Sequence, residues 1–332
     1  MEIKGTVLSK HIRKKVFDPE HNTFAITNFY DSLQSKDKYT NVNCNGFGRL
    51  RKFEKFSLFL KDKTQNTKPL YRGYPKSKSF YSQVFQIAGC NWRCWYCFVD
   101  DKILSADKSK VKMLTTDELI ELYLNQKNRP NIIDLSGGQP DLVPEWTLSM
   151  LKSIEKYGLR NKVYVWIDDN LSVEMKQYLT VKELNYIVNF PKLSKVGSFK
   201  GYDECSFVFN TKASMDEYDK QFKVFKSLIN HGFDMYAYVS FTAPPESIYN
   251  IKQKIKNFIK KLQEVHFNLP LRVIPLKIHP FTAIQDRNFQ KYDISKVYEH
   301  QYIVYQVWRD ELKKQYSLES LEVAYEEINL RI

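Results

Sequence analysis

The chain has no run of eighteen consecutive apolar residues among its 332, so no transmembrane helix is expected. It also lacks a secretory signal at its start, because residues 1–15 are polar and basic and contain no apolar segment. These two absences predict a cytoplasmic protein with no membrane attachment. The hydrophobic residues, 43% of the chain, suffice for a large core.

Cysteine is scarce and unevenly placed. The chain has five cysteines, an odd number, and three of them lie within eight residues. A small secreted scaffold would carry an even number spread along a shorter chain, so a disulfide framework is excluded. Clustered thiols in such a protein indicate a metal site instead.

Acidic residues are outnumbered by basic ones. The chain has 38 Asp and Glu against 51 Lys and Arg, which gives a formal net charge of +13. Such a charge favours contact with an acidic partner, which is a nucleic acid, an acidic protein or an anionic cofactor. The lysines are scattered, however, so a merely solvated surface explains the charge equally well.

From residue 80 onward, short apolar runs alternate with amphipathic segments. Strands that alternate with helices through short connections form parallel βα units. The sequence therefore predicts an α/β fold, a partial (β/α)6 TIM-like barrel, with ligands at the carboxyl ends of its strands. We divide the chain into a basic N-terminal extension (1–79), the barrel (80–290) and a C-terminal helical segment (291–332). The predicted strands are 83–88, 131–135, 162–167, 195–200, 235–241 and 271–278.

Local signals place the helices between these strands. Thr115 and Ser214 are each followed three residues later by glutamate, which is the spacing of a capping box at a helix start. Pro144 suits a first helical turn, and Gly158 suits the end of the same helix. The predicted helices are 115–126, 144–157, a stretch from 172, 214–232, 246–262 and 295–315.

The three clustered cysteines are Cys90, Cys94 and Cys97, directly after the first predicted strand. Three thiolates on one loop suit an iron–sulfur cluster and leave one iron open, whereas structural zinc normally takes four ligands. The alternatives are buried free cysteines, or a zinc site completed by a distant histidine. Trp92 and Trp95 lie between the cysteines, where they either shield the site from water or pack in the core.

This Cys-x3-Cys-x2-Cys segment, with the aromatic Tyr96 before its last cysteine, resembles the signature of the radical S-adenosyl-L-methionine (radical SAM) superfamily. The resemblance covers roughly residues 80–281. It implies a [4Fe–4S] cluster whose open iron binds SAM, one-electron cleavage of SAM to a 5′-deoxyadenosyl radical, and a low-potential electron donor such as flavodoxin or ferredoxin. Cys44 and Cys205 lie outside the motif and are expected to be dispensable for the cluster.

A second segment, Gly137, Gly138, Gln139 and Pro140, follows the second predicted strand. It resembles the Gly-Gly-Glu-Pro segment of the same superfamily, whose backbone meets the amino group of SAM. Glutamate is replaced here by Gln139, which is tolerable where the contact is made by the main chain. We expect the two glycines to serve the ligand rather than the fold, since glycine permits close backbone approach.

Three further positions at strand ends are candidate ligand contacts. Lys200 resembles the lysine of an Asp-Leu-Lys segment in glycyl-radical activating enzymes, which contacts the SAM carboxylate, although Ser198 replaces the aspartate. The alternative is a solvated surface lysine. His279 resembles the histidine of a Leu-Pro-Tyr-His segment in those enzymes and is expected beside the adenosine or the substrate, unless it is structural. Asp168, Asp169 and Asn170 follow the third predicted strand. They either bind ribose or substrate, or cap the next helix.

We therefore predict an oxidoreductase or modifying enzyme that abstracts hydrogen from an unidentified substrate. The substrate is a protein, a peptide or RNA in one version, and a small metabolite held in the barrel in another. An alternative of a different class is a non-catalytic cluster-binding module in a nucleic-acid complex. The N-terminal extension interleaves basic and aromatic residues, which either act together to hold a macromolecule or divide, with the phenylalanines packed on the barrel and the charges solvated. These residues are Arg13, Lys14, Lys15, Phe47, Arg49, Arg51, Lys52, Phe53, Lys55, Phe56 and Phe59.

Overall fold

A computed structural model describes residues 5–30, 32–37, 40–52, 81–284, 287 and 293–330. Six parallel strands form the centre of its sheet and pair in the order in which they occur along the chain. They are β5 (Tyr81–Ile87), β7 (Ile132–Gly137), β8 (Tyr164–Asp169), β9 (Leu193–Phe199), β10 (Met235–Ser240) and β11 (Val273–Leu276). All six predicted strands are confirmed. Within the described residues β11 pairs only with β10, so the barrel is partial and the sheet does not close.

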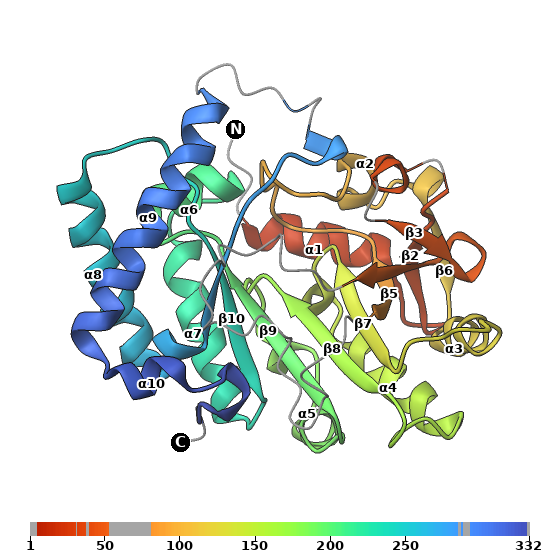
Figure 1. The fold of residues 1–332 in the computed structure, drawn as a ribbon. Helices are drawn as coiled ribbons and strands as arrows, with labels where there is room; N and C mark the ends of the chain where they lie inside the picture. The colour runs from red at the N-terminus through yellow and green to blue at the C-terminus, as the bar shows by residue number, and fades with distance from the viewer. Residues whose placement is uncertain are drawn as a thin grey trace.

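Helices follow the strands and pack on the outer face of the sheet (Figure 1). The principal ones are α3 (Thr116–Leu124), α4 (Glu145–Lys156), α5 (Val181–Val188), α7 (Glu217–Asn230), α8 (Ile248–Val265) and α9 (Ile294–Gln315). Shorter ones are α2 (Asp101–Leu104), α6 (Glu204–Thr211) and α10 (Leu318–Glu322). No helix of the described residues is both long enough and apolar enough to cross a membrane.

The signals at Thr115 and Pro144 are confirmed, whereas the capping box at Ser214 and the helix expected from residue 172 are wrong. The Thr115 capping box opens α3, and α4 begins directly after Pro144. Ser214 does not cap α7, because only its backbone carbonyl is used, by the amide of Glu217, in the turn before the helix. The helix expected from residue 172 is instead a 3-10 turn at Met175–Gln177, and α5 begins only at Val181.

The sheet has two differently filled faces, because side chains alternate along each strand. The outer face belongs to the large core that the helices cover. The inner face holds a separate, smaller cluster of apolar and aromatic side chains. This cluster consists of Ile132, Trp166, Val196, Tyr236, Ile274 and Tyr325, with Tyr164 and Tyr238 packed against it. The charged residues considered below share this inner face.

The described part of the N-terminal extension is built into the barrel. Its strands β2 (Thr23–Thr27) and β4 (Gly48–Lys52) both pair antiparallel with β5. Helix α1 (Gly5–Val16) supplies Ile12 and Val16 to the same core that the barrel helices cover. The remaining short strands are β1 (Phe17–Asp18), β3 (Asn41–Asn43) and β6 (Val111–Leu114).

The expected packing of aromatic residues from the extension is seen for Phe47, which lies half-buried against the core. Phe53, Lys55, Phe56 and Phe59 lie outside the described residues. The division of the chain at residues 79 and 290 stays a prediction.

A substitution tests whether the extension stabilises the barrel. Phe24 on β2 is fully buried and packs edge-on against Trp146 of α4, with ring centroids 5.3 Å apart. Phe24→Ala removes this contact and leaves a cavity, so we expect the free energy of unfolding to fall by about 3–5 kcal/mol in urea titrations. Val7→Ala, at a position that is 61% exposed on α1, is the control and should change it by less than about 0.5 kcal/mol. Equal stability of the two variants would contradict the shared core.

Candidate functional site

The cysteine loop follows β5 at the carboxyl end of the sheet. Cys90 and Cys94 are buried, Cys97 is half-buried, and all three are free thiols. Burial raises the pKa of the Cys94 thiol to about 12, and the positive charge of Lys200 is the strongest influence that lowers it. Burial also raises the pKa of Cys90, which both Cys97 and Lys200 influence. The three thiols and one ammonium group therefore share one small region.

The donor set in this region fits an iron–sulfur cluster better than a single metal ion. Three thiols are the ligands that such clusters take, and the nearby cation offsets the charge of thiolates. No three His, Cys, Asp or Glu side chains in the described residues converge as the ligands of one ion would. The thiols of a cluster each bind a different iron and need not converge in that way.

Lys200 and Tyr96 show that the ends of two further strands, β9 and β10, lie near this loop. Lys200 directly follows β9 and lies close enough to Cys90 and Cys94 to influence their pKa values, so it is not a remote surface lysine. Tyr96 is buried, and its hydroxyl lies 2.7 Å from the Ser240 hydroxyl at the end of β10. Burial raises the pKa of Tyr96 well above its ordinary value. The hydrogen bond of Tyr96 thus joins the cysteine loop to the end of β10.

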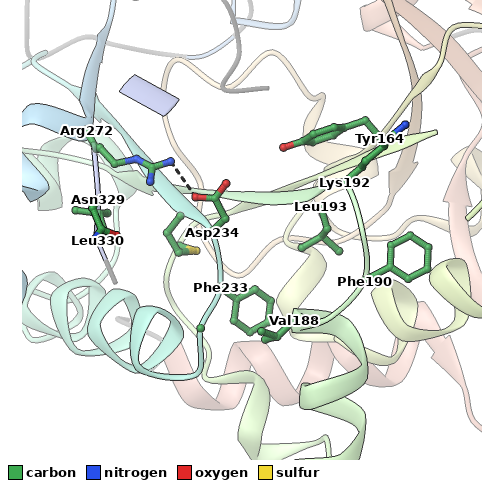
Figure 2. Close-up of a pocket in the computed structure, with 12 residues that line it drawn as sticks. Tyr164, Val188, Phe190, Lys192, Leu193, Phe233, Asp234, Arg272, Asn329 and Leu330 are labelled. Atoms are coloured by element: carbon green, nitrogen blue, oxygen red, sulfur yellow. Dashed lines mark hydrogen bonds and ion pairs between the residues drawn. The ribbon is translucent and has the colours of Figure 1, made fainter. Parts of the chain in front are cut away.

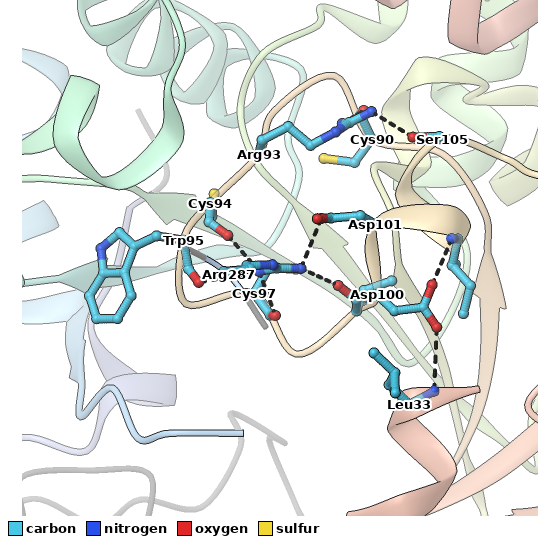
Figure 3. A network of polar contacts seen from close by, with 12 residues as sticks. Leu33, Cys90, Arg93, Cys94, Trp95, Cys97, Asp100, Asp101, Ser105 and Arg287 are labelled. Atoms are coloured by element: carbon cyan, nitrogen blue, oxygen red, sulfur yellow. Dashed lines mark hydrogen bonds and ion pairs between the residues drawn. The ribbon is translucent and has the colours of Figure 1, made fainter. Parts of the chain in front are cut away.

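Arg287, which no sequence pattern singled out, lies among the backbone carbonyls of the cysteine loop (Figure 3). Its guanidinium donates hydrogen bonds of 2.7–3.2 Å to backbone carbonyls of the loop and pairs with Asp101 at 3.1 Å. The accepting carbonyls belong to Cys94, Trp95, Cys97 and Val99. A single arginine in an irregular segment has no local signature that marks such a role.

The Gly-Gly turn contacts the start of the cysteine loop through its backbone. The amide of Gly138 donates to the carbonyl of Ile87 at 3.0 Å, and the amide of Gln139 donates to that of Gly89 at 2.8 Å. A Cβ on Gly138 would lie 2.0 Å from the Gly89 oxygen. Gly137 has a φ of +113°, and a Cβ there would lie 1.8 Å from Gln86. Packing therefore requires glycine at both positions, so these glycines serve the fold as well, and their contact with a ligand stays a prediction.

The Gln139 side chain is buried in a polar cluster between the sheet and the helices. Its amide nitrogen donates to Asp169 at 2.7 Å, and its amide oxygen accepts from the backbone amide of Asn170 at 2.8 Å. Lys195, fully buried on β9, pairs with Asp141 at 2.8 Å and with Asp169 at 3.5 Å. A glutamate at position 139 would face the Asp169 carboxylate, so the departure from Gly-Gly-Glu-Pro matches its surroundings.

The three polar residues that end β8 point in different directions. Asp168 faces inward and accepts a hydrogen bond from the Ser136 hydroxyl of β7. Asp169 and Asn170 instead bond to the backbone amides of Leu171 and Ser172, which form a turn and not a helix start. The expectation that all three either face one ligand or cap the next helix is therefore wrong. Only Asp168 remains a candidate ligand contact.

Asn170 connects the polar cluster to the cysteine loop. Its side-chain amide donates to Asn91 at 3.0 Å and lies 3.7 Å from the Cys90 sulfur. Trp92 and Trp95 are buried, and Trp95 donates to Asn210 of α6 at 2.9 Å, so both tryptophans pack in the core. His279 lies half-buried beyond the end of β11, and its role stays a prediction.

A cavity of about 320 Å³ lies at the opposite end of the sheet (Figure 2). It is lined where β8 to β11 begin, by Tyr164, Leu193, Met235 and Arg272 among others, and contains the ion pair between Arg272 and Asp234. None of the predicted site residues lines it. Because ligands of parallel barrels bind at the carboxyl ends of the strands, the cysteine loop and not this cavity marks the candidate site.

A family model described as Radical SAM superfamily matches residues 85–268. None of the curated proteins compared with the chain matches it. Among solved structures, SuiB of Streptococcus suis bound to S-adenosylmethionine is 15% identical, with a TM-score of 0.43 over 70% of this chain and 47% of that one. The structure of anSMEcpe with bound AdoMet is 15% identical, with a TM-score of 0.45 over 71% and 58%.

A radical SAM methyltransferase from Sphaerobacter thermophilus is 10% identical, with a TM-score of 0.27 over 67% of this chain and 72% of that one. The chain spans about half the length of SuiB and of anSMEcpe.

The polar cluster around Gln139 is tested by Gln139→Glu. The introduced carboxyl is buried beside Asp169, so its pKa in the folded protein is raised above the unfolded value of about 4.3. The free-energy cost of burying the ionised carboxylate is then fully present above the raised pKa. It disappears as the pH falls toward the pKa of the unfolded chain. We expect a loss of about 2–4 kcal/mol in unfolding free energy at neutral pH, which shrinks toward pH 4.

Denaturant titrations of the variant and the parent at several pH values check this expectation. Gln177→Glu is the matched control, because Gln177 is exposed, and it should change the unfolding free energy by less than about 0.5 kcal/mol. A loss in Gln139→Glu that stays constant from pH 4 to pH 8 would attribute the damage to shape rather than to charge.

Proposed function

The chain belongs to the radical SAM superfamily, whose family model spans more than half of it, and we propose that Cys90, Cys94 and Cys97 hold its [4Fe–4S] cluster. It is an enzyme of the radical SAM type, and the cofactors of that superfamily are a [4Fe–4S] cluster and SAM. Membership in an enzyme superfamily removes the basis for a non-catalytic binding module. When bound, the cluster supplies the electron that cleaves SAM to methionine and a 5′-deoxyadenosyl radical.

The observation that carries this proposal is that Lys200, Arg287 and the Gly-Gly turn all lie next to the cysteine loop. Cluster ligands must be deprotonated, and burial opposes this for Cys90 and Cys94 because it raises the pKa of both thiols. Lys200 and Arg287 lower the pKa of the Cys94 thiol, so they favour its ligating form. Arg287 also fixes the loop backbone through its hydrogen bonds to the carbonyls.

The remaining predicted residues have proposed roles toward SAM. The backbone of Gly137, Gly138, Gln139 and Pro140 meets its amino group. The Lys200 ammonium binds its carboxylate, since charge-assisted hydrogen bonds of this kind are strong. Tyr96 lines the same site between its two neighbouring cysteines. Asp168 and His279 are proposed to contact ribose, adenosine or substrate.

The substrate is proposed to be a protein, a peptide or RNA, on which the enzyme removes a hydrogen atom. The net charge of +13 supports an acidic macromolecule, and a small metabolite is the alternative. A low-potential flavodoxin or ferredoxin is proposed as the electron donor.

Anaerobic purification tests the cluster assignment. The protein should be brown, with about four irons per chain, since a three-thiolate site matches a [4Fe–4S] cluster. With SAM and dithionite it should form 5′-deoxyadenosine, measured by chromatography. Alanine at Cys90, Cys94 or Cys97 should remove both the iron and the product.

The matched controls are Cys205→Ala, at an exposed position, and Cys44→Ala, at a buried one. Both should keep the iron content and the product. Zinc in stoichiometric amount without iron would refute the proposal, and loss of iron in either control would show that ligands are missing from it.

A further inference from the structure

The inner face of the sheet carries two arginines that come from the N-terminal extension. Arg49 and Arg51 lie two residues apart on β4 and so share one face of the strand. Val84 of β5 is the register partner of Arg49 on one side and of Asp134 of β7 on the other. The two arginines therefore lie level with the inward-facing carboxylates of the barrel.

The two arginines differ in their partners. Arg51 pairs with Asp134 at 3.1 Å and lies over the ring of Trp166. Arg49 is only 6% exposed, and its Nε has no hydrogen-bond partner among the described residues. Its guanidinium lies over the ring of Phe98, at 5.5 Å from the ring centroid. Phe98 directly follows Cys97, so this guanidinium lies beside the cysteine loop.

Burial of the Arg49 guanidinium is unfavourable unless an anion pairs with it. Burying a charge costs several kcal/mol unless hydrogen bonds and an opposite charge offset the loss of water. Burial lowers the pKa of Arg49 to about 10, and Arg51 adds to this, so the group is still a cation at neutral pH. The carboxylates of Asp134 and Asp168 attract it without a direct bond and have other partners, Arg51 and Ser136.

We propose that Arg49 binds an anionic oxygen group of the substrate, a carboxylate or a phosphate, on the inner face of the barrel beside the cysteine loop. This inference rests on the proposed function and adds the chemistry by which the substrate is recognised. A guanidinium fork matches both anions through paired hydrogen bonds. Arg49 lies outside residues 85–268, the part that matches the family model, so this contact is supplied by the extension.

Binding of two small anions tests the proposal. Inorganic phosphate and acetate are titrated anaerobically into the cluster-loaded protein and followed by calorimetry, and the tighter of the two identifies the anion class. Arg49→Gln should weaken that probe about tenfold or more, since charge-assisted hydrogen bonds are among the strongest in proteins. Arg160→Gln is the control, because Arg160 pairs with Glu155 at the surface and should leave the affinity unchanged. Equal affinities in all three proteins, or no binding by the parent, overturn the proposal.

Thermal unfolding without added anion provides a readout that a structural arginine would not give. Arg49→Met removes a buried charge whose Nε has no hydrogen-bond partner among the described residues, so the Tm of this variant should equal or exceed that of the parent. Arg51→Met leaves Asp134 buried without its cation, and its Tm should fall. An equal fall in both variants would show that Arg49 only supports the fold.

Competition with SAM separates this proposal from the one on which it rests. Saturating SAM should leave the affinity of the parent protein for the probe unchanged. Displacement of the probe by SAM would assign Arg49 to the SAM carboxylate and overturn the proposal. Failure of the parent to form 5′-deoxyadenosine would refute the proposed function, whereas the anion affinities of the parent and Arg49→Gln would still decide the role of Arg49.

Discussion

The backbone contact between Gly89 and Gly138 is the constraint on which the rest of the site depends. Two hydrogen bonds join the start of the cysteine loop to the turn after β7, and a Cβ on Gly138 would approach the Gly89 oxygen to 2.0 Å. No residue other than glycine fits there without moving one of the two loops. The loop proposed to hold the cluster and the turn proposed to hold SAM are therefore fixed relative to each other before any ligand binds, which is the preorganisation that a reactive site requires.

A buried polar cluster extends this constraint to the cysteines. Gln139 donates a hydrogen bond to Asp169. The side chain of the following residue, Asn170, donates to Asn91 and lies 3.7 Å from the Cys90 sulfur. Lys195 places its charge between Asp141 and Asp169 beneath them. Such a network is stable only while each member keeps its partners, because unpaired polar groups are costly at low dielectric. The sequence of the Gly-Gly turn is thus coupled through Gln139 to the buried residues Asp169 and Asn170.

The strands, most of the helices and the cysteine loop were predictable because their signals are local. Apolar runs mark β7 and β8, and the spacing of Cys90, Cys94 and Cys97 lies within one loop. Arg287 and Lys195 were missed because their partners lie far away in the chain, across 190 and 54 residues in the case of Cys97 and Asp141. The prediction at Ser214 was wrong for a different reason. The local pattern fitted a capping box, but Ser214 lies in the turn that precedes α7 and its side chain does not cap the helix.

The buried cations of the described residues differ in whether the chain itself provides their partners. Lys195 has two carboxylates, and Arg287 has four backbone carbonyls and an aspartate, so both are satisfied by the chain itself. Arg49 is also largely buried, at 6% exposure, but its Nε has no hydrogen-bond partner within the part of the chain that the structure describes. A surplus of basic residues is usually attributed to an outer surface that meets an acidic partner. In this chain two basic residues, Arg49 and Arg51, lie on the inner face of the sheet, and Arg49 lies beside the proposed cluster loop.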